Sequence, residues 1–313
     1  ATFRQVYDFV IQIQHPKGNR FRRYYQQMQE RVSKYLQEHG KKVSYSIPIG
    51  KIVQQIKTLP SKEKRMIRLS HDVGQREDGS IGYKSRLSIP SRGKQSLIDF
   101  IGSNIPSDEY FTYTHQTELD GVLSFGSAII SMVWHDETLF PELIQWYVDA
   151  LTNIEKHTTC SEKLADDIQM LDIMLQLALE SEKNENLRPV CYGALMFLCA
   201  MMEKLLRALY VYLLQDEKFV LLSSVTLGTL LDGEQSILVN VFGKDHLRSI
   251  GYFLGTVGKK KIGRNIRNSL AHWISMSREE LCSTKVAQLA YFYTDILNTV
   301  LLYIHGLLKD ENE

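Results

Sequence analysis

The segment IGRNIRNSLAHW, residues 262–273, carries the residue types with the clearest chemical potential in this chain of 313 residues. Asn268 and His272 are four residues apart, so on a helix they share a face and the amide can orient the imidazole. An imidazole exchanges protons near neutral pH, and the guanidinium of Arg267 stays cationic and binds phosphate through two hydrogen bonds. These side chains therefore suit proton transfer and charge stabilisation at a phosphodiester.

The same segment predicts an amphipathic helix. At about 100° per residue, Arg264, Arg267, Asn268 and His272 gather on a polar side around Ala271, whose small side chain allows a second helix to approach closely. The apolar side chains fall on the opposite side: Ile262, Ile266, Leu270 and Trp273. Arg267 and His272 border a shared groove, which suits a cleft formed where two copies of this face meet.

Arg267, Asn268 and His272 form the pattern R-N-x-x-x-H, which resembles the signature of the HEPN superfamily of all-helical ribonucleases. The wider stretch is similar to an uncharacterised branch with the form N-x-R-N-x-x-A-H, matched here from Asn265 to His272. The runs EKLLR (203–207) and TLGTLL (226–231) also resemble that branch. The resemblance covers about residues 160–313 and does not reach the first third of the chain.

The resemblance implies a homodimer that cleaves RNA without a metal or other cofactor, in a cleft where the two motif helices face each other. The 2′-hydroxyl of RNA is the nucleophile, and the expected products end in a 2′,3′-cyclic phosphate and a 5′-hydroxyl. His272 exchanges protons, Arg267 holds the scissile phosphate, and Asn268 fixes the histidine tautomer or binds a phosphate oxygen. The resemblance further suggests anti-phage defence or a toxin, with room for an inhibitory or activating protein partner.

Residues beside the motif are candidates for supporting roles. Arg264 and the run Lys259, Lys260 and Lys261 precede the polar face and are candidate contacts to the RNA backbone, although the lysine run also fits a solvated loop. Glu203 and Arg207 are one helical turn apart, so they either pair inside the bundle or support the cleft. The alternative to an enzyme is a non-catalytic HEPN module that dimerises and binds RNA or a nucleotide within a larger assembly.

The helical pattern predicts a mainly α fold with a helical bundle in residues 159–313, and the resemblance implies that this bundle is antiparallel and of the HEPN type. One stripe of a helix near 161–183 is apolar, residues 186–215 are apolar nearly all round with Pro189 in the first turn, and 283–308 is again amphipathic. With the helix that begins at the motif, these segments form four helices of a bundle. The predicted stripe consists of Leu164, Ile168, Leu171, Leu175 and Ala178.

Residues 1–158 are expected to form a basic N-terminal region of helical or mixed α/β structure, with a role in binding RNA or a partner, or in sensing. Helical spacing covers 1–40 and 110–157, whereas VSYSIPI (43–49) and YKSRLSI (83–89) alternate as short strands do. The stretch HDVGQREDGSIG, residues 71–82, has the composition of an exposed polar loop.

Charge is distributed unevenly along the chain. Residues 1–96 hold 20 basic and 7 acidic side chains, a balance of +13, so the remainder carries −12 for a net charge of +1. This asymmetry indicates either a polyanionic partner such as RNA for the first third or attraction between the two parts. Arginines and tyrosines between residues 20 and 31 suit either base stacking or a solvated helix face.

Composition and motifs exclude several classes of protein. A hydrophobic content of 44% and a charged content of 23% are typical of a globular protein, and the apolar run Val190–Met202 is too short to cross a bilayer. The sequence contains no P-loop, dinucleotide-binding or nucleophile-elbow motif. The four cysteines are scattered without metal-ligand spacing, so we expect reduced thiols in a cytoplasmic protein with no membrane partner.

Overall fold

The computed structural model describes residues 48–75, 79–89, 107–158, 163–214, 226–231, 236–255, 266–271 and 281–306, with four isolated residues before 48 (Arg20, Tyr24, Gln27 and Arg31). The chain divides into two compact units. One comprises Ala1–Pro48 and Arg92–Thr114, and the other comprises Ile49–Ser91 and His115–Glu313. The second unit contains nearly all the described residues, and it is the one described below.

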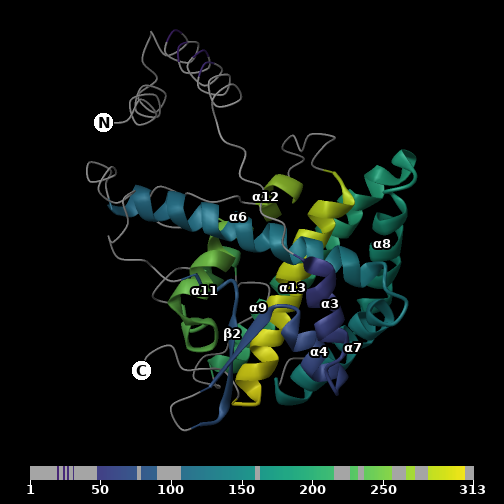
Figure 1. Ribbon diagram of the computed structural model, residues 1–313. Coiled ribbons are helices and arrows are strands. Elements are labelled where there is room, and N and C mark those ends of the chain that lie inside the picture. The colour runs from purple at the N-terminus through teal and green to yellow at the C-terminus, as the bar shows by residue number, and fades with distance from the viewer. Residues whose placement is uncertain are drawn as a thin grey trace. The chain divides into compact units, whose positions relative to one another are not determined.

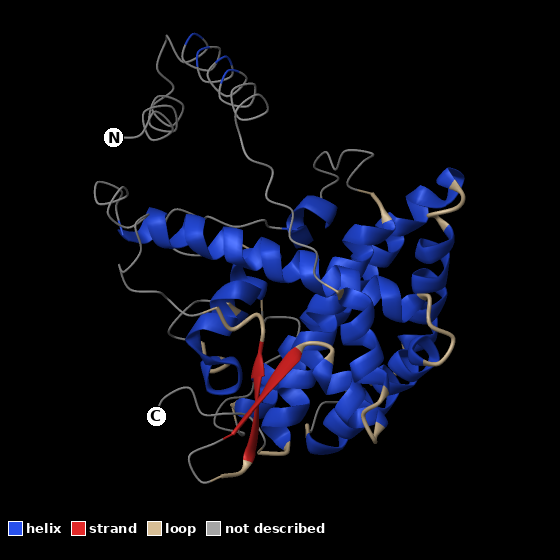
Figure 2. Cartoon of the chain, viewed as in Figure 1, coloured by secondary structure: helices blue, strands red, loops and turns tan. Residues whose placement is uncertain are grey.

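Figures 1 and 2 show that the described residues are mainly helical, as predicted. The sheet among them is one antiparallel pair, β1 and β2, joined in a register that places His71 opposite Ser85. No helix in the described ranges is both long enough and apolar enough to span a membrane. The elements are α3 (Ile49–Lys57), α4 (Lys62–Arg68), β1 (His71–Gln75), β2 (Ile81–Ser85), α6 (Ser107–Trp134), α7 (Leu139–His157), α8 (Ile168–Glu180), η1 (Glu185–Leu187), α9 (Arg188–Leu213), α10 (Leu227–Leu230), α11 (Val239–Leu254), α12 (Ile266–Ala271) and α13 (Ser283–Ile304).

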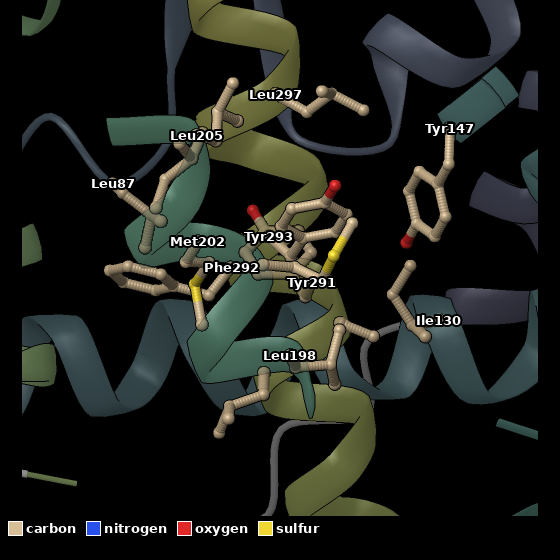
Figure 3. Close-up of a cluster of buried hydrophobic side chains, with 14 of the residues drawn as sticks. Leu87, Ile130, Tyr147, Leu198, Met202, Leu205, Tyr291, Phe292, Tyr293 and Leu297 are labelled. Carbon is tan, nitrogen blue, oxygen red and sulfur yellow. The ribbon is translucent and has the colours of Figure 1, made fainter. Parts of the chain in front are cut away.

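The core of the second unit is built around α9 and α13. These two helices pack against each other, α8 packs against both, and α7 packs against α8 and α13. Figure 3 shows Leu198, Met202 and Leu205 of α9 meeting Tyr291, Phe292 and Tyr293 of α13. Buried side chains on nearly every side of α13 explain why its apolar and small polar residues are spread all round the helix.

The local predictions for the bundle helices are confirmed where the structure describes them. All five residues of the predicted stripe, Leu164, Ile168, Leu171, Leu175 and Ala178, are buried. Pro189 stands in the first turn of α9, where its missing amide hydrogen costs no helical bond. Helix α7 also belongs to this core, beside α8, α9 and α13. The predicted helix that begins at the motif is described over Ile266–Ala271, and the rest of its predicted length lies outside the described ranges.

The prediction of an exposed polar loop over residues 71–82 is wrong. His71–Gln75 and Ile81–Ser85 form the β-hairpin, and His71 is fully buried where the hairpin meets α13. This burial depends on a partner 228 residues away, which the local composition does not reveal. Of the predicted strand 83–89, only Tyr83–Ser85 lies in β2. Residues 43–47 lie outside the described ranges, and Ile49 begins helix α3.

The predicted boundary at residue 158 also differs from the division in the structure. Residues 49–91 and 115–158 belong to the same compact unit as the C-terminal helices. Two buried hydrogen bonds join α7 to α13, one from Trp146 Nε1 to Asn298 Oδ1 at 2.9 Å and one between the Tyr147 and Thr294 hydroxyls at 2.8 Å. Because α7 completes the core of the bundle, it cannot belong to a separate N-terminal domain.

Ion pairs within this unit account for part of the charge asymmetry. Lys57 Nζ lies 2.8 Å from Asp136 Oδ2, just before α7, and Arg65 binds both carboxylate oxygens of Glu142 on α7. Lys62 pairs with Asp149, also on α7. Basic residues of α3 and α4 therefore meet acidic residues at and before α7, which favours attraction within the chain for this part of the basic region. Of these three ion pairs, Arg65 with Glu142 has the most favourable geometry, because the guanidinium binds both carboxylate oxygens.

Helices α6 and α13 approach each other closely at Gly126. A Cβ atom on Gly126 would lie 2.4–2.5 Å from ring atoms of Tyr291, a fully buried side chain of α13. Carbon atoms that are not bonded to each other do not approach to this distance, so the packing of α6 against Tyr291 requires glycine at this position. Gly121, on the same helix, has nothing within 4 Å of the corresponding Cβ position.

We therefore expect Gly126→Ala and Gly121→Ala to change the free energy of unfolding in opposite directions. Overpacking against Tyr291 makes Gly126→Ala destabilising by about 1–3 kcal/mol, despite the better helix propensity of alanine. Gly121→Ala gains that propensity without a clash and is stabilising by roughly 0.5–1 kcal/mol. Urea denaturation of both variants measures the difference, and equal effects at the two positions contradict the close approach.

Candidate functional site

The described part of the predicted motif helix has the amphipathic orientation that the sequence indicates. Helix α12, Ile266–Ala271, packs against α9 and α11. Leu270 is fully buried, and Ile266 packs partly buried against the core. The side chain of Arg267 keeps 39% of its surface exposed. The apolar back and the arginine side of this helix therefore lie where the helical wheel puts them.

Glu203 of α9 links the two candidate arginines. Its Oε2 accepts a hydrogen bond from Arg267 Nε at 3.2 Å, and its Oε1 accepts one from Arg207 Nη2 at 2.6 Å. Glu203 is a largely buried acidic side chain, whereas both arginines are partly exposed. One carboxylate thus holds two guanidinium groups in fixed positions, and the cluster of these three residues carries a net positive charge.

The remaining predicted site residues lie outside what the structure describes. His272, Arg264, Lys259, Lys260 and Lys261 are outside the described ranges, and for Asn268 only the backbone, within α12, is described. Among the predicted site residues, the structure therefore brings together Arg267, Glu203 and Arg207.

Tyr192 is a contact to the motif helix that sequence reasoning missed. Its hydroxyl, from the second turn of α9, donates a hydrogen bond of 2.5 Å to the backbone carbonyl oxygen of Leu270. The two residues are 78 positions apart, so no spacing rule connects them. The sequence offers one sign of this contact. Tyr192 precedes Glu203 by 11 residues, which is close to three full helical turns, so both side chains lie on the same face of α9.

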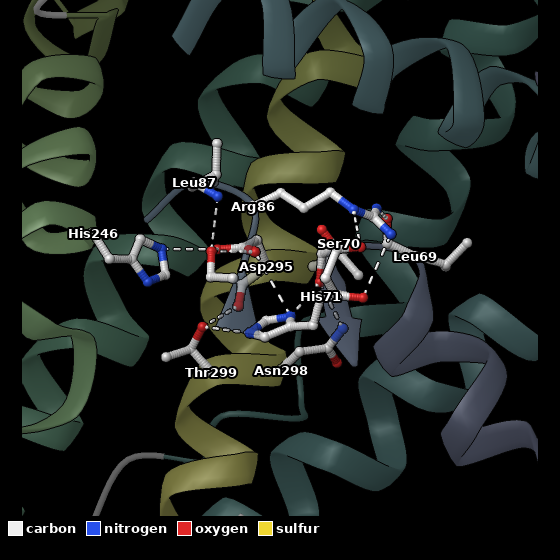
Figure 4. A network of polar contacts seen from close by, with 12 residues as sticks. Leu69, Ser70, His71, Arg86, Leu87, His246, Asp295, Asn298 and Thr299 are labelled. Carbon is white, nitrogen blue, oxygen red and sulfur yellow. Dashed lines mark hydrogen bonds and ion pairs between the residues drawn. The ribbon is translucent and has the colours of Figure 1, made fainter. Parts of the chain in front are cut away.

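A second polar cluster, shown in Figure 4, lies in the middle of α13. Both carboxylate oxygens of Asp295 lie 2.9 Å from the Ser85 hydroxyl, and His246 Nε2 of α11 lies 2.8 Å from Oδ2. On the other side, His71 Nδ1 lies 3.7 Å from Oδ1. The ring of His71 also hydrogen-bonds to Thr299 Oγ1 at 3.1 Å. This cluster joins the hairpin, α11 and α13.

Burial controls the protonation of His71. Its pKa falls from 6.5 to about 4, chiefly because burial disfavours the imidazolium, while the nearby Asp295 carboxylate opposes the fall without cancelling it. His71 is therefore neutral near pH 7. Asp295, His71 and His246 are all sealed from solvent, so their acid–base groups have no access to a substrate and serve the fold.

The two clusters differ in what they can do chemically. The Asp295 cluster contains proton-transfer groups but excludes solvent, whereas the Glu203 cluster presents a half-exposed guanidinium that can bind an anion. Within the described ranges, no group of three or more histidine, cysteine, aspartate or glutamate side chains has an arrangement that would hold a metal ion. The cysteines there, Cys191, Cys199 and Cys282, are free thiols.

No match was found when the chain was compared with protein-family models, with curated proteins and with solved structures.

The lowered pKa of His71 predicts how stability depends on pH. The unfolded chain binds a proton at this histidine near pH 6.5 and the folded chain only near pH 4, so the stabilisation is intact above 6.5 and is lost as pH falls. The loss contributed by His71 amounts to about 3 kcal/mol and levels off below pH 4. In His71→Gln, we expect a free energy of unfolding that falls less between pH 7 and 4 than in the wild type.

His135→Gln is the matched control, because His135 is an exposed histidine of the same unit. Chemical denaturation at a series of pH values measures the free energy of unfolding. For His135→Gln, this free energy should depend on pH as it does in the wild type. If the free energy of unfolding depends on pH in the same way in the wild type and in His71→Gln, the lowered pKa of His71 does not control this dependence.

Proposed function

We propose that this chain is a metal-independent endoribonuclease of the HEPN type that works as a homodimer, with Arg267, Asn268 and His272 at the cleavage site. The observation that carries the proposal is the ion pairing of Glu203 with Arg267 and Arg207. It joins two of the segments on which the resemblance depends, EKLLR and the R-N-x-x-x-H motif, although they are 64 residues apart. A shared site requires this proximity.

A second observation supports the same proposal. The third similar segment, TLGTLL, contains helix α10, and α10 packs against α9, as α12 does. Leu230 of α10 and Leu270 of α12 are both buried. Of the three segments that resemble one family, one therefore lies within α9 and the other two pack against it. Chance similarity of three short motifs would not require them to lie together in the fold.

In the proposed reaction, the 2′-hydroxyl oxygen of RNA forms a bond to the neighbouring phosphorus, and the bond from phosphorus to the 5′-oxygen breaks. The 2′-hydroxyl gives up its proton to a base and the leaving 5′-oxygen takes one from an acid, roles that suit two imidazoles of His272 from two copies. Arg267 stabilises the negative charge on the phosphorane-like transition state. The carboxylate of Glu203 orients that guanidinium before substrate binds. Anti-phage defence or toxin activity in the cytoplasm is the cellular role we propose.

Replacing either central residue tests the reaction. We expect Arg267→Ala and His272→Ala each to lower cleavage of an end-labelled RNA by at least about 100-fold, because one loses transition-state stabilisation and the other proton transfer. The assay contains excess EDTA, and the wild-type products should carry 2′,3′-cyclic phosphate and 5′-hydroxyl ends. Circular dichroism and light scattering establish that the variants remain folded and dimeric.

Arg68→Ala and His135→Ala are matched controls. Arg68 has a similar exposure to Arg267 and pairs with Asp72 on β1, and His135 lies between α6 and α7. Both controls should cleave at the wild-type rate. RNA binding without cleavage from about pH 6 to 8 would instead identify a non-catalytic binding module, and cleavage that requires magnesium would place the activity elsewhere.

Glu203→Gln tests the supporting carboxylate. The amide keeps the shape of the side chain but loses the charge that holds Arg267 and Arg207, so we expect cleavage to fall roughly tenfold, less than in Arg267→Ala. Glu142→Gln is the control, because Glu142 pairs with Arg65 in the same unit without contact to α12. Initial rates at saturating RNA measure both. Equal rates for Glu203→Gln and the wild type contradict the role of Glu203.

A further inference from the structure

The described part of the motif helix, α12 (Ile266–Ala271), is held by contacts with its neighbours. The Tyr192 hydroxyl of α9 donates a hydrogen bond to the backbone carbonyl oxygen of Leu270 at 2.5 Å. This bond ties the backbone of α12 to the side chain of another helix.

A single face of α9 supplies this contact and the contact to Arg267. Tyr192, Cys199 and Glu203 are spaced by seven and four residues, which keeps them on one stripe of the helix. Tyr192 holds the backbone at Leu270, while Glu203 holds the side chain of Arg267. The two points on α9 are about 16 Å apart along the helix axis, so together they resist both sliding and rotation of α12.

The fully buried side chain of Leu270 supplies a third restraint. Its burial fixes which side of α12 faces the core, and the Tyr192 hydrogen bond to the same residue fixes the backbone there. In the sequence, His272 is two residues beyond the carbonyl that Tyr192 binds. The restraint therefore acts close in the sequence to the residue to which the proposed function gives proton transfer.

We infer that Tyr192 is a positioning residue of the ribonuclease site, which sets the backbone of the motif helix at Leu270 relative to Arg267 through its hydrogen bond to the Leu270 carbonyl. This role rests on the proposed function. The hydroxyl acts through the backbone of α12 and needs no contact with RNA. Its removal therefore affects the rate of the chemical step, whereas RNA binding through phosphate contacts is preserved.

Tyr192→Phe in the full-length protein removes one hydroxyl and leaves the ring. We expect kcat for RNA cleavage to fall about tenfold with KM unchanged within about twofold, because misplacement of catalytic groups by a fraction of an ångström slows the reaction without weakening binding. The melting temperature should fall by no more than about 2–4 °C. Hydrogen exchange in a peptide covering Ile266–Ala271 should accelerate, since α12 has lost its anchor at Leu270.

Tyr210→Phe is the matched control. Tyr210 lies on the same helix, is also partly buried, and has no hydrogen-bond partner for its hydroxyl within the described ranges. This variant should match the wild type in kcat, KM and hydrogen exchange. If Tyr192→Phe keeps full kcat in a protein that Arg267→Ala and His272→Ala inactivate, Tyr192 has no positioning role, although the proposed function stands.

Two further outcomes also decide the inference. A loss of kcat in Tyr192→Phe that merely follows a smaller folded fraction, with no change in hydrogen exchange at α12, overturns the positioning role. A wild-type protein that leaves RNA intact overturns the proposed function, and the role of Tyr192 falls with it. The wild type and the two inactivating variants therefore separate failure of the function from failure of the inference.

Discussion

The described unit depends on Asp295, an acidic side chain in the middle of α13, a helix with buried side chains along most of its length. Asp295 has no exposed surface, and a buried carboxyl group is tolerated only when hydrogen bonds within the protein replace those to water. The Ser85 hydroxyl and the imidazoles of His246 and His71 surround it. Each comes from a different part of the chain, so satisfying one group requires β1, β2 and α11 to assemble on α13. The polar requirement of one side chain thereby specifies a tertiary arrangement.

Burial also separates the polar cluster on α13 from the one on α9. On α13, Thr294, Asp295, Asn298 and Thr299 are all buried, and neighbouring elements use up their hydrogen-bonding capacity. On α9, Glu203 also lies largely buried, but the guanidinium groups that it binds reach the surface. A buried anion that carries an exposed cation is a natural support for an anion-binding site, because the cation is held in place without being hidden. Accessibility, more than residue type, distinguishes the two clusters.

Local periodicity predicted the bundle helices because their burial follows a repeat of 3.6 residues. In α8, the stripe of Ile168, Leu171, Leu175 and Ala178 is buried, and in α12 the buried Leu270 lies opposite Arg267. The hairpin at 71–85 was missed because its inner end is buried by Thr299 and Asp295, more than 200 residues away. The division of the chain in the structure also differs from the predicted boundary, since α7 packs on α13. Tyr192 was missed because its acceptor is a backbone carbonyl, which carries no sequence signal.

Ion pairing bears on where the RNA of the proposed function would bind. Lys57, Lys62 and Arg65 are paired with acidic groups at and before α7, so binding of a polyanion there would first have to break those pairs. Arg267 and Arg207 share the carboxylate of Glu203, which offsets at most one of their two positive charges. Under the proposed function, the phosphodiester therefore binds at the motif helix and not at the ion-paired surface of α3 and α4.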